Sequence, residues 1–226
     1  MEEGHPDTAE TLFSLGDLAL VEQNFEEAEN SYRKALDILE GSYGEGNFRT
    51  AKAWTSLAKL FERKQQWSKA QPLLGRAVES VEAVLGPSHL EVADLLEKSG
   101  KVYLVSGAVE KVAEPLKRAL QIRQESLGDD HPATARVLSL QGDHATLLGD
   151  LKTARRLYGK ADNIISDFHG SDSHLRFPYR FAFARTLRRM GELEQAESHI
   201  QVMLDRLTGE SQETRLKIAN LKEEMA

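Results

Sequence analysis

The chain has 226 residues, of which 40% are hydrophobic and 7% aromatic, and it carries a formal net charge of −7 without any cysteine. This length suits one elongated domain, and no apolar run approaches the roughly 18 residues that a membrane-spanning helix needs. The N-terminal stretch MEEGHPDTAE has neither the basic start nor the apolar core of a secretion signal. We therefore expect a cytoplasmic protein that does not enter a membrane. The absence of cysteine agrees with this location without establishing it.

A period of 42 residues runs through the sequence. Four glycines mark it, at Gly44, Gly86, Gly128 and Gly170. Three further columns with the same spacing hold mostly small residues: Gly16, Ala58, Gly100, Gly142 and Ala184; Ala28, Ala70, Val112, Ala154 and Ala196; and Ala35, Ala77, Ala119, Ala161 and Met203. A repeat of this length is one supersecondary unit that buries its apolar face only against its neighbours. The sequence therefore predicts five stacked copies whose helices approach closely.

Each copy is expected to hold two amphipathic helices. In the first copy, apolar residues recur at helical spacing from Leu12 to Ala19 and again from Phe25 to Leu39. Turns between the two helices are predicted at five equivalent positions: Gln23-Asn24, Gln65-Gln66, Gly107-Ala108, Gly149-Asp150 and Gly191-Glu192. Three of these turns use glycine, which is typical of the residue that ends a helix. No segment shows the strict alternation of a strand, so the predicted class is all-α.

The junctions between copies also repeat. The first and fourth copies open with a His-Pro pair, His5-Pro6 and His131-Pro132, and proline is well tolerated in the first helical turn. Because His89 and His174 stand at the corresponding junctions, we interpret these histidines as products of the repeat. The third copy is the least regular, with Val112 in an alanine column, and we expect it to pack least well.

The columns of small residues and the junction from Leu127 to Pro132 resemble the tetratricopeptide repeat in its long form, as found in kinesin light chains and related scaffold proteins. The resemblance implies a right-handed superhelical solenoid of five helix-turn-helix repeats plus a C-terminal capping helix, all in a single domain over residues 1–226. The repeats are expected at about 4–44, 45–86, 87–128, 129–170 and 171–210, with the capping helix at about 211–225.

The resemblance also implies a concave groove, lined by the first helices, that holds a protein or peptide partner. Carried over residue by residue, the groove positions include Phe13, Asp17, Lys52, Lys59, Arg63, Lys101, Arg136, Asp143, Phe181, Arg185, Arg188 and Arg189. The basic members in repeats 2 and 5 would bind acidic side chains. Apolar contact is expected from Phe13, Leu20, Val21, Leu104 and Val105. The predicted partner segment is therefore acidic and partly apolar.

Charge is distributed unevenly along the chain. Residues 1–50 contain 12 acidic and 3 basic side chains, whereas residues 151–190 contain 9 basic and 3 acidic ones. The helix expected over residues 174–190 combines five arginines with four aromatic residues: Arg176, Arg180, Arg185, Arg188, Arg189, Phe177, Tyr179, Phe181 and Phe183. Two interpretations stay open, a binding hot spot of arginines with exposed aromatics, or a solvated arginine face opposite buried aromatics.

Motifs for catalysis are missing from the sequence, which has no phosphate-binding loop, nucleophile elbow or HExxH pattern. The acidic total argues against a nucleic-acid partner. Potential metal ligands are densest from Asp167 to His174, but this stretch is the expected loop between repeats 4 and 5. We therefore predict a non-catalytic scaffold or adaptor without cofactor or metal. The alternative is structural self-assembly, with weak contacts between the acidic and basic ends, or a regulatory module of a larger protein or complex.

Overall fold

The computed structural model describes residues 5–171 and 173–205 together with Leu216 and Asn220. These residues form ten α-helices, two short 3-10 helices and no strand. The α-helices are α1 (Pro6–Val21), α2 (Phe25–Tyr43), α3 (Phe48–Arg63), α4 (Trp67–Leu85), α5 (Leu90–Ser106), α6 (Ala113–Leu127), α7 (Pro132–Leu147), α8 (Leu151–His169), α9 (Phe177–Arg189) and α10 (Leu193–Asp205). The 3-10 helices are η1 (Val109–Lys111) and η2 (His174–Arg176). Apart from Leu216 and Asn220, the capping helix predicted over residues 211–225 lies outside the described part.

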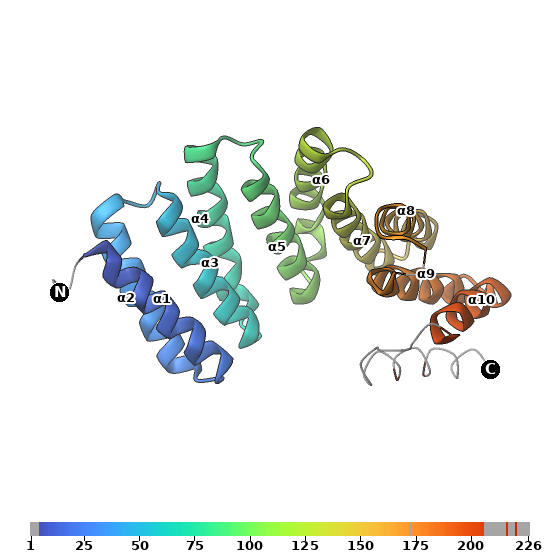
Figure 1. Cartoon of the computed structure of the whole chain (residues 1–226), viewed down its shortest axis with the longest axis horizontal. Coiled ribbons are helices and arrows are strands. Elements are labelled where there is room, and N and C mark those ends of the chain that lie inside the picture. The colour runs from blue at the N-terminus through green and yellow to red at the C-terminus, as the bar shows by residue number, and fades with distance from the viewer. Residues whose placement is uncertain (1–4, 172, 206–215, 217–219, 221–226) are drawn as a thin grey trace. The chain divides into compact units, whose positions relative to one another are not determined.

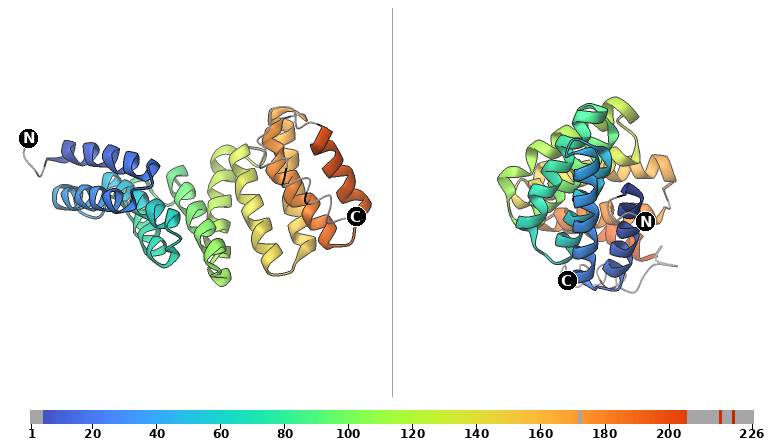
Figure 2. Two further views of the ribbon diagram at one scale, coloured as in Figure 1. Left: turned by 90° about the horizontal axis from the view of Figure 1, so that it is seen from below. Right: turned by 90° about the vertical axis from the view of Figure 1, so that its left-hand side faces the viewer.

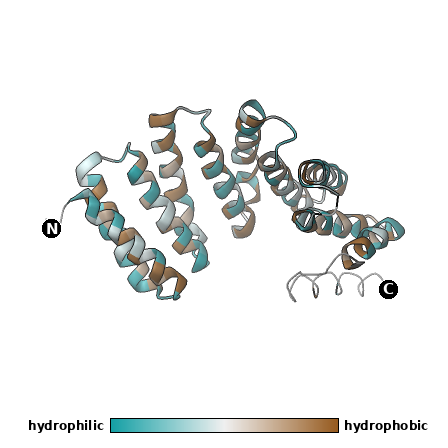
Figure 3. Cartoon of the chain, viewed as in Figure 1, coloured by the Kyte–Doolittle hydropathy of each residue, from teal (hydrophilic) through white to brown (hydrophobic). Residues whose placement is uncertain are grey.

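The helices pack in the order of the chain. Within repeats 1, 2, 4 and 5 the first helix packs on the second, as α1 does on α2 and α7 on α8, and the second helices α2, α4 and α8 pack on the first helices that follow them, α3, α5 and α9. The contacts divide the chain into two compact units, which we call unit 1 (up to Ile122) and unit 2 (from Arg123). Within each unit, consecutive helices lie side by side (Figures 1 and 2), and polar and apolar residues are interleaved along every helix (Figure 3). The predicted all-α solenoid of helix-turn-helix repeats is confirmed.

The repeated glycines occupy backbone conformations that other residues rarely adopt. The φ angles of Gly44, Gly86, Gly128 and Gly170 lie between 76° and 93° and end the second helices of four repeats. The predicted turns inside the repeats also have positive φ, which glycine supplies in repeats 3, 4 and 5. In repeats 1 and 2 the same position holds Gln23 and Gln65, with φ of 62° and 55°. A left-handed backbone costs these glutamines about 1–2 kcal/mol each.

The column of Gly and Ala lies where the two helices of a repeat meet. A Cβ atom added at Gly16 would stand 2.6 Å from the Tyr32 ring, and one at Gly142 would stand 2.7 Å from the Tyr158 ring. Both distances are too short for a methyl group, so glycine is needed opposite tyrosine. In repeats 2 and 5 the column holds alanine, and a leucine or isoleucine, Leu74 or Ile200, takes the tyrosine's place. Repeat 3 keeps glycine opposite an aliphatic residue, because a Cβ atom added at Gly100 would lie too close to the Leu116 side chain.

Histidine begins three of the first helices as an N-cap. The Nδ1 atoms of His5, His89 and His131 accept hydrogen bonds from the backbone N–H two residues later, at 3.2, 3.2 and 3.1 Å. Asn47 takes this place in repeat 2 and Ser173 in repeat 5. Grouping His174 with the junction histidines was therefore wrong by one residue, because Ser173 holds the capping position.

Repeat 3 is irregular in its backbone, as predicted. Its second helix begins with η1, and α6 starts only at Ala113, whereas the other second helices of unit 1 start directly after their turn. Val112 and Leu116 are nevertheless both completely buried, and the expectation that this repeat packs least well stays a prediction. The extra turn moves the backbone while the two apolar side chains keep their places in the core.

Candidate protein-binding surface

The predicted groove residues come from the first helices α1, α3, α5, α7 and α9. Eight of the twelve are exposed, namely Asp17, Lys52, Lys59, Arg63, Lys101, Arg136, Arg185 and Arg189. Asp143, Phe181 and Arg188 are half-buried. Most of the positions taken from the family resemblance are therefore accessible to a partner.

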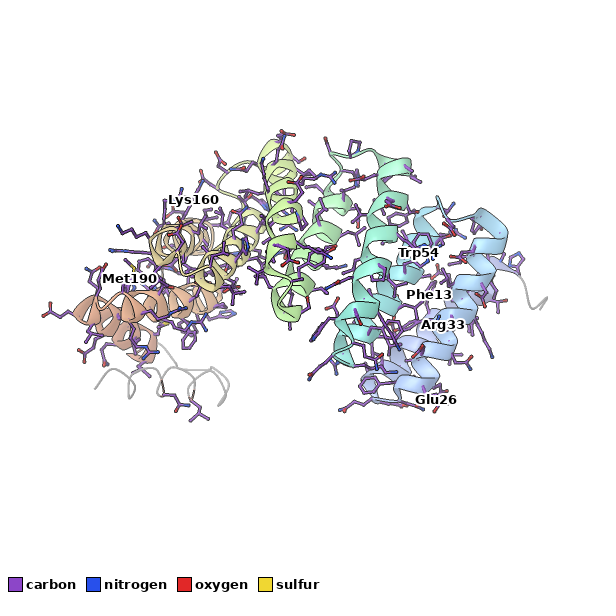
Figure 4. All side chains as sticks on the ribbon, turned by 180° about the vertical axis from the view of Figure 1, so that it is seen from behind. Phe13, Glu26, Arg33, Trp54, Lys160 and Met190 are labelled. Atoms are coloured by element: carbon purple, nitrogen blue, oxygen red, sulfur yellow. The ribbon has the colours of Figure 1, made fainter. Side chains whose placement is uncertain are left out.

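Phe13 departs from this pattern. Only 3% of it is exposed, its ring centre lies 6.3 Å from that of Tyr32, and the Lys52 ammonium lies 5.0 Å above the ring. Figure 4 shows Phe13 and Trp54 within the body of unit 1, with Glu26 and Arg33 at its edge. Leu20 is also buried, at 4% exposure. The apolar contact predicted at Phe13 and Leu20 is therefore wrong, because both side chains belong to the core.

Exposed apolar residues on the same side of unit 1 are Val21 and Val105, at 77% and 55% exposure. Lys52 is engaged within the repeat array, since its ammonium lies 3.0 Å from the Glu10 carboxylate. A partner would have to compete with Glu10 for this lysine. The N-terminal end of the predicted groove thus offers a valine and a paired lysine.

In unit 1, three predicted residues gather around one hollow. Lys59, Arg63 and Lys101 line a cavity of about 200 Å³ between α3 and α5. Glu62 lies in the same wall, and burial raises the pKa of its carboxyl group although Lys101 and Lys98 act in the opposite direction. Three cations around one partly buried acid give this hollow a positive surface.

In unit 2, four predicted residues converge on a larger cavity. Arg136, Asp143, Phe181 and Arg185 line a hollow of about 1020 Å³ formed by α7, α8, η2 and α9. Its volume lies at the upper end of the range of ligand sites in proteins. The remaining lining residues are His131, Pro132, Ala133, Ser139, Ile165, His169, His174, Leu175, Phe177, Pro178, Tyr179 and Ala182. Arg188 and Arg189, also predicted, are not part of this wall.

The cavity wall carries charged groups of both signs. Asp143 accepts a hydrogen bond of 2.7 Å from the Tyr158 hydroxyl. Burial raises the pKa of the Asp143 carboxyl group, against the opposing effects of this hydrogen bond and of the Arg185 charge. The guanidinium groups of Arg136 and Arg185 line the same cavity. Their positive charge favours an anionic ligand group.

The residues predicted as one Arg-rich helix over positions 174–190 form η2 and α9, and their arginines divide into buried and exposed ones. Arg176 is 7% exposed, and its guanidinium donates to both carboxylate oxygens of the buried Asp162, at 2.9 and 2.6 Å, and to the Ser171 carbonyl at 2.7 Å. The Arg180 Nε atom lies 3.6 Å from the same carboxylate. Neither open interpretation of this helix was complete, because Arg176 forms part of the core while Arg185 and Arg189 face solvent.

Sequence reasoning missed the cavity histidines and the buried ion pair. His131, His169 and His174 all line the cavity although they come from different segments, which no periodic pattern indicates. The buried pair did leave a signal. Asp162 stands in a column that holds Leu36, Val78, Leu120 and Leu204 in the other repeats, and a lone acid in an apolar column predicts a buried cation beside it.

Metal ligation and membrane insertion find no structural basis in the described residues. Within them, no group of three or more His, Cys, Asp or Glu side chains is arranged to hold a metal ion. None of the helices described combines the length and apolarity required to cross a bilayer.

Comparison with known proteins identifies the repeat. Two segments match models described as tetratricopeptide repeat, at residues 113–164 and 9–38. BtubC (BKLC) from P. vanneervenii has a similar structure, with a TM-score of 0.77 and 17% identity over 97% of this chain and 82% of that one. A kinesin-light-chain protein of Podosopora anserina with nearly identical TPR-like repeats is similar with a TM-score of 0.76 and 16% identity, over 99% and 98% of the two chains.

The chain was also compared with a structure that holds a bound factor and with curated protein sequences. A Rap protein solved in complex with Competence and Sporulation Factor has a TM-score of 0.67 and 14% identity, over 95% of this chain and 63% of that one. No curated protein sequence matches the chain. At these identities the structural likeness shows the fold.

Proposed function

We propose that the chain is a non-catalytic scaffold that binds a segment of another protein on the surface of its first helices; two of its segments match tetratricopeptide-repeat models, and its fold is similar to that of a kinesin-light-chain protein. The observation that carries this proposal is the cavity of about 1020 Å³ in unit 2, to which four predicted groove residues contribute. The Rap protein, which has a similar fold, was solved in complex with Competence and Sporulation Factor, and this supports a binding function for the fold.

The chemistry of the cavity defines the segment it would hold. Arg136 and Arg185 offer guanidinium groups for carboxylates, and such charge-assisted pairs are the strong hydrogen bonds of protein interfaces. Phe177, Phe181 and Leu175 provide the apolar part of the wall, where an aliphatic or aromatic side chain of the partner would lie. The bound segment is therefore acidic and partly apolar. The hollow of Lys59, Arg63 and Lys101 in unit 1 is suited to acidic groups as well.

The test reverses the charges that face the ligand. The protein and its Arg136→Glu, Arg185→Glu variant are used to retain partners from a matched lysate, and the retained proteins are identified by mass spectrometry. The matched control is Lys152→Glu, Arg156→Glu, which makes the same charge change at two exposed positions on α8 outside the cavity wall. Partners held by wild type and control should be lost from the cavity variant, with affinity falling about 100-fold for two lost ion pairs.

Equal retention by all three proteins would remove the cavity from the proposal. A third variant, Arg189→Glu, tests whether the binding surface extends to the exposed end of α9, as the family resemblance implies. The same proposal includes a cytoplasmic location. Cell fractionation with a tagged form of the protein tests this, and the tagged protein is expected in the cytoplasmic fraction.

A second candidate function is self-assembly. Its basis is the uneven charge, with 12 acidic and 3 basic residues in positions 1–50 but 9 basic and 3 acidic ones in positions 151–190. The acidic end of one copy would meet the basic end of the next, which gives a heterologous contact. Light scattering at low and high salt tests this, since such a contact weakens as salt screens the charges. A monomer at both salt concentrations would rule it out.

A further inference from the structure

The side of α1 that is turned away from α2 carries a row of uncovered leucines. Leu15 and Leu18 are 48% and 56% exposed, and Leu12 beside them is half-buried. Gly16 faces Tyr32 of α2, so the leucines lie on another side of the helix. Figure 3 shows the apolar residues along the C-terminal part of α1. We call this row the leucine face.

The same positions are covered in the next repeat. One period further on, Leu12, Leu15 and Leu18 become Trp54, Leu57 and Leu60 of α3, which are 1%, 1% and 0% exposed. α3 packs against α2, the second helix of the preceding repeat. In repeat 1, no helix among the described residues takes the place that α2 has on α3. The leucine face is therefore built as a helix-packing surface.

A polar pair crosses each covered interface of this kind in unit 1 at one fixed position. The Lys64 ammonium at the end of α3 lies 3.2 Å from the Glu29 carboxylate of α2. One repeat later, Gln71 of α4 donates to the Ser106 hydroxyl of α5 at 3.0 Å. Glu22 is the residue of repeat 1 at the position of Lys64 and Ser106. A helix that covers the leucine face would meet this carboxylate, so it needs a cation there.

The charge around the face selects its occupant. Between His5 and Tyr43 the chain has nine acidic and two basic residues, an excess of seven negative charges. A second copy placed on the leucine face through its own repeat 1 would bring two such regions together, and like charges within a Debye length repel. A positively charged helix would be attracted. Charge and apolar pattern together thus favour a basic amphipathic helix over a second copy.

We propose that the leucine face of α1 is a docking surface for a basic amphipathic helix of a partner protein, which packs on Leu12, Leu15 and Leu18 and pairs with Glu22. The helix takes the place on α1 that α2 has on α3. This surface lies in repeat 1, while the cavity of the proposed function belongs to unit 2, so the chain has two separate docking surfaces. The leucine face would recognise its partner mainly through apolar contacts, whereas the cavity in unit 2 would do so through its arginines.

The experiment measures binding of a defined probe. The probe is a fluorescein-labelled model helix of 16 residues, as long as α1, with leucine along one face and lysine along the other. A matched probe carries glutamate in place of lysine. Fluorescence anisotropy is recorded with the full chain, with the variant Leu15→Gln, Leu18→Gln, and with the control Leu147→Gln, Leu148→Gln, which changes two leucines of unit 2 that are 56% and 63% exposed.

The lysine probe should bind wild type and control equally and the Leu15→Gln, Leu18→Gln variant about tenfold more weakly, as expected for the loss of central apolar contacts. Glu22→Lys, which alters an exposed side chain and leaves packing intact, should weaken the lysine probe and favour the glutamate probe. Equal binding to all variants, or equal binding of both probes to wild type, would overturn the proposal. A wild-type dimer in light scattering that Leu15→Gln, Leu18→Gln converts to a monomer would also overturn it, in favour of a second copy.

Discussion

Substituting alanine for Gly142 should force the two helices of repeat 4 apart unless Tyr158 is shortened at the same time. A methyl group at Gly142 would lie 2.7 Å from Cε1 and 2.9 Å from both Cδ1 and Cζ of the Tyr158 ring. That ring is completely buried and its hydroxyl is bonded to Asp143, so it has little freedom to move away. The substitution therefore tests whether the column of small residues is set by its neighbour.

The expected magnitudes follow from the geometry. Overpacking of a core costs about 1–3 kcal/mol, from which the preference of a helix for alanine over glycine subtracts about 1 kcal/mol. Gly142→Ala alone should thus lower the free energy of unfolding by about 0–2 kcal/mol. Tyr158→Leu alone should cost about 2 kcal/mol through the lost hydrogen bond and the smaller buried side chain. The double variant recreates the pair of Ala58 and Leu74, which are both buried in repeat 2.

The assay is a double-mutant cycle from urea unfolding followed by circular dichroism. The two substitutions together should cost at least about 1 kcal/mol less than the sum of the single effects. Gly75→Ala is the control, because nothing lies within 4 Å of the added Cβ in α4, and it should raise stability by about 0.5–1 kcal/mol. Additive effects of Gly142→Ala and Tyr158→Leu would refute the explanation of the column by steric fit.

Three further outcomes are expected. Gln65→Gly should raise the free energy of unfolding by about 1 kcal/mol, since glycine adopts the φ of 55° at this turn without strain; an unchanged melting temperature would contradict this. Asp162→Asn should cost about 3–5 kcal/mol in urea unfolding, because it leaves the buried Arg176 without its carboxylate. Burial, with Arg180 and Arg176 nearby, lowers the pKa of His199 below 6.5, so the neutral form is favoured on folding. Stability should therefore fall as the pH drops below 6.5, and His199→Gln should remove that part of the pH dependence.

The helices and turns could be predicted from the sequence because they depend on local periodicity. Gly107 and Gly149 stand where the apolar pattern breaks, and both have positive φ in the structure. Asp143 and Arg185 could be placed on one surface because they are one period apart. Residues that recur with the repeat carry the information about the fold.

Features that depend on pairs of side chains from different helices could not be predicted in this way. Phe13 stands at a groove position by spacing, but its ring is covered because Tyr32 and Lys52 lie against it. The cavity in unit 2 is lined by both His169, at the end of α8, and His174, at the start of η2. Such contacts depend on how the helices are placed relative to one another, and the spacing of residues along one helix does not predict that placement.

The tyrosines of repeats 1 and 4 connect the charge of the surface with the interior. Asp17 and Asp143 accept hydrogen bonds of 2.7 Å from Tyr32 and Tyr158, and each tyrosine requires the glycine that precedes its aspartate. The other three repeats have lysine or arginine at this surface position and an aliphatic residue inside. A single substitution at Asp17 would remove this hydrogen bond from the buried Tyr32 hydroxyl, whereas the Tyr158 hydroxyl also lies 3.4 Å from the Thr146 hydroxyl. In repeat 1 the acidic surface position is therefore tied to the core, and a change of its charge without loss of stability requires glycine, aspartate and tyrosine to be exchanged together.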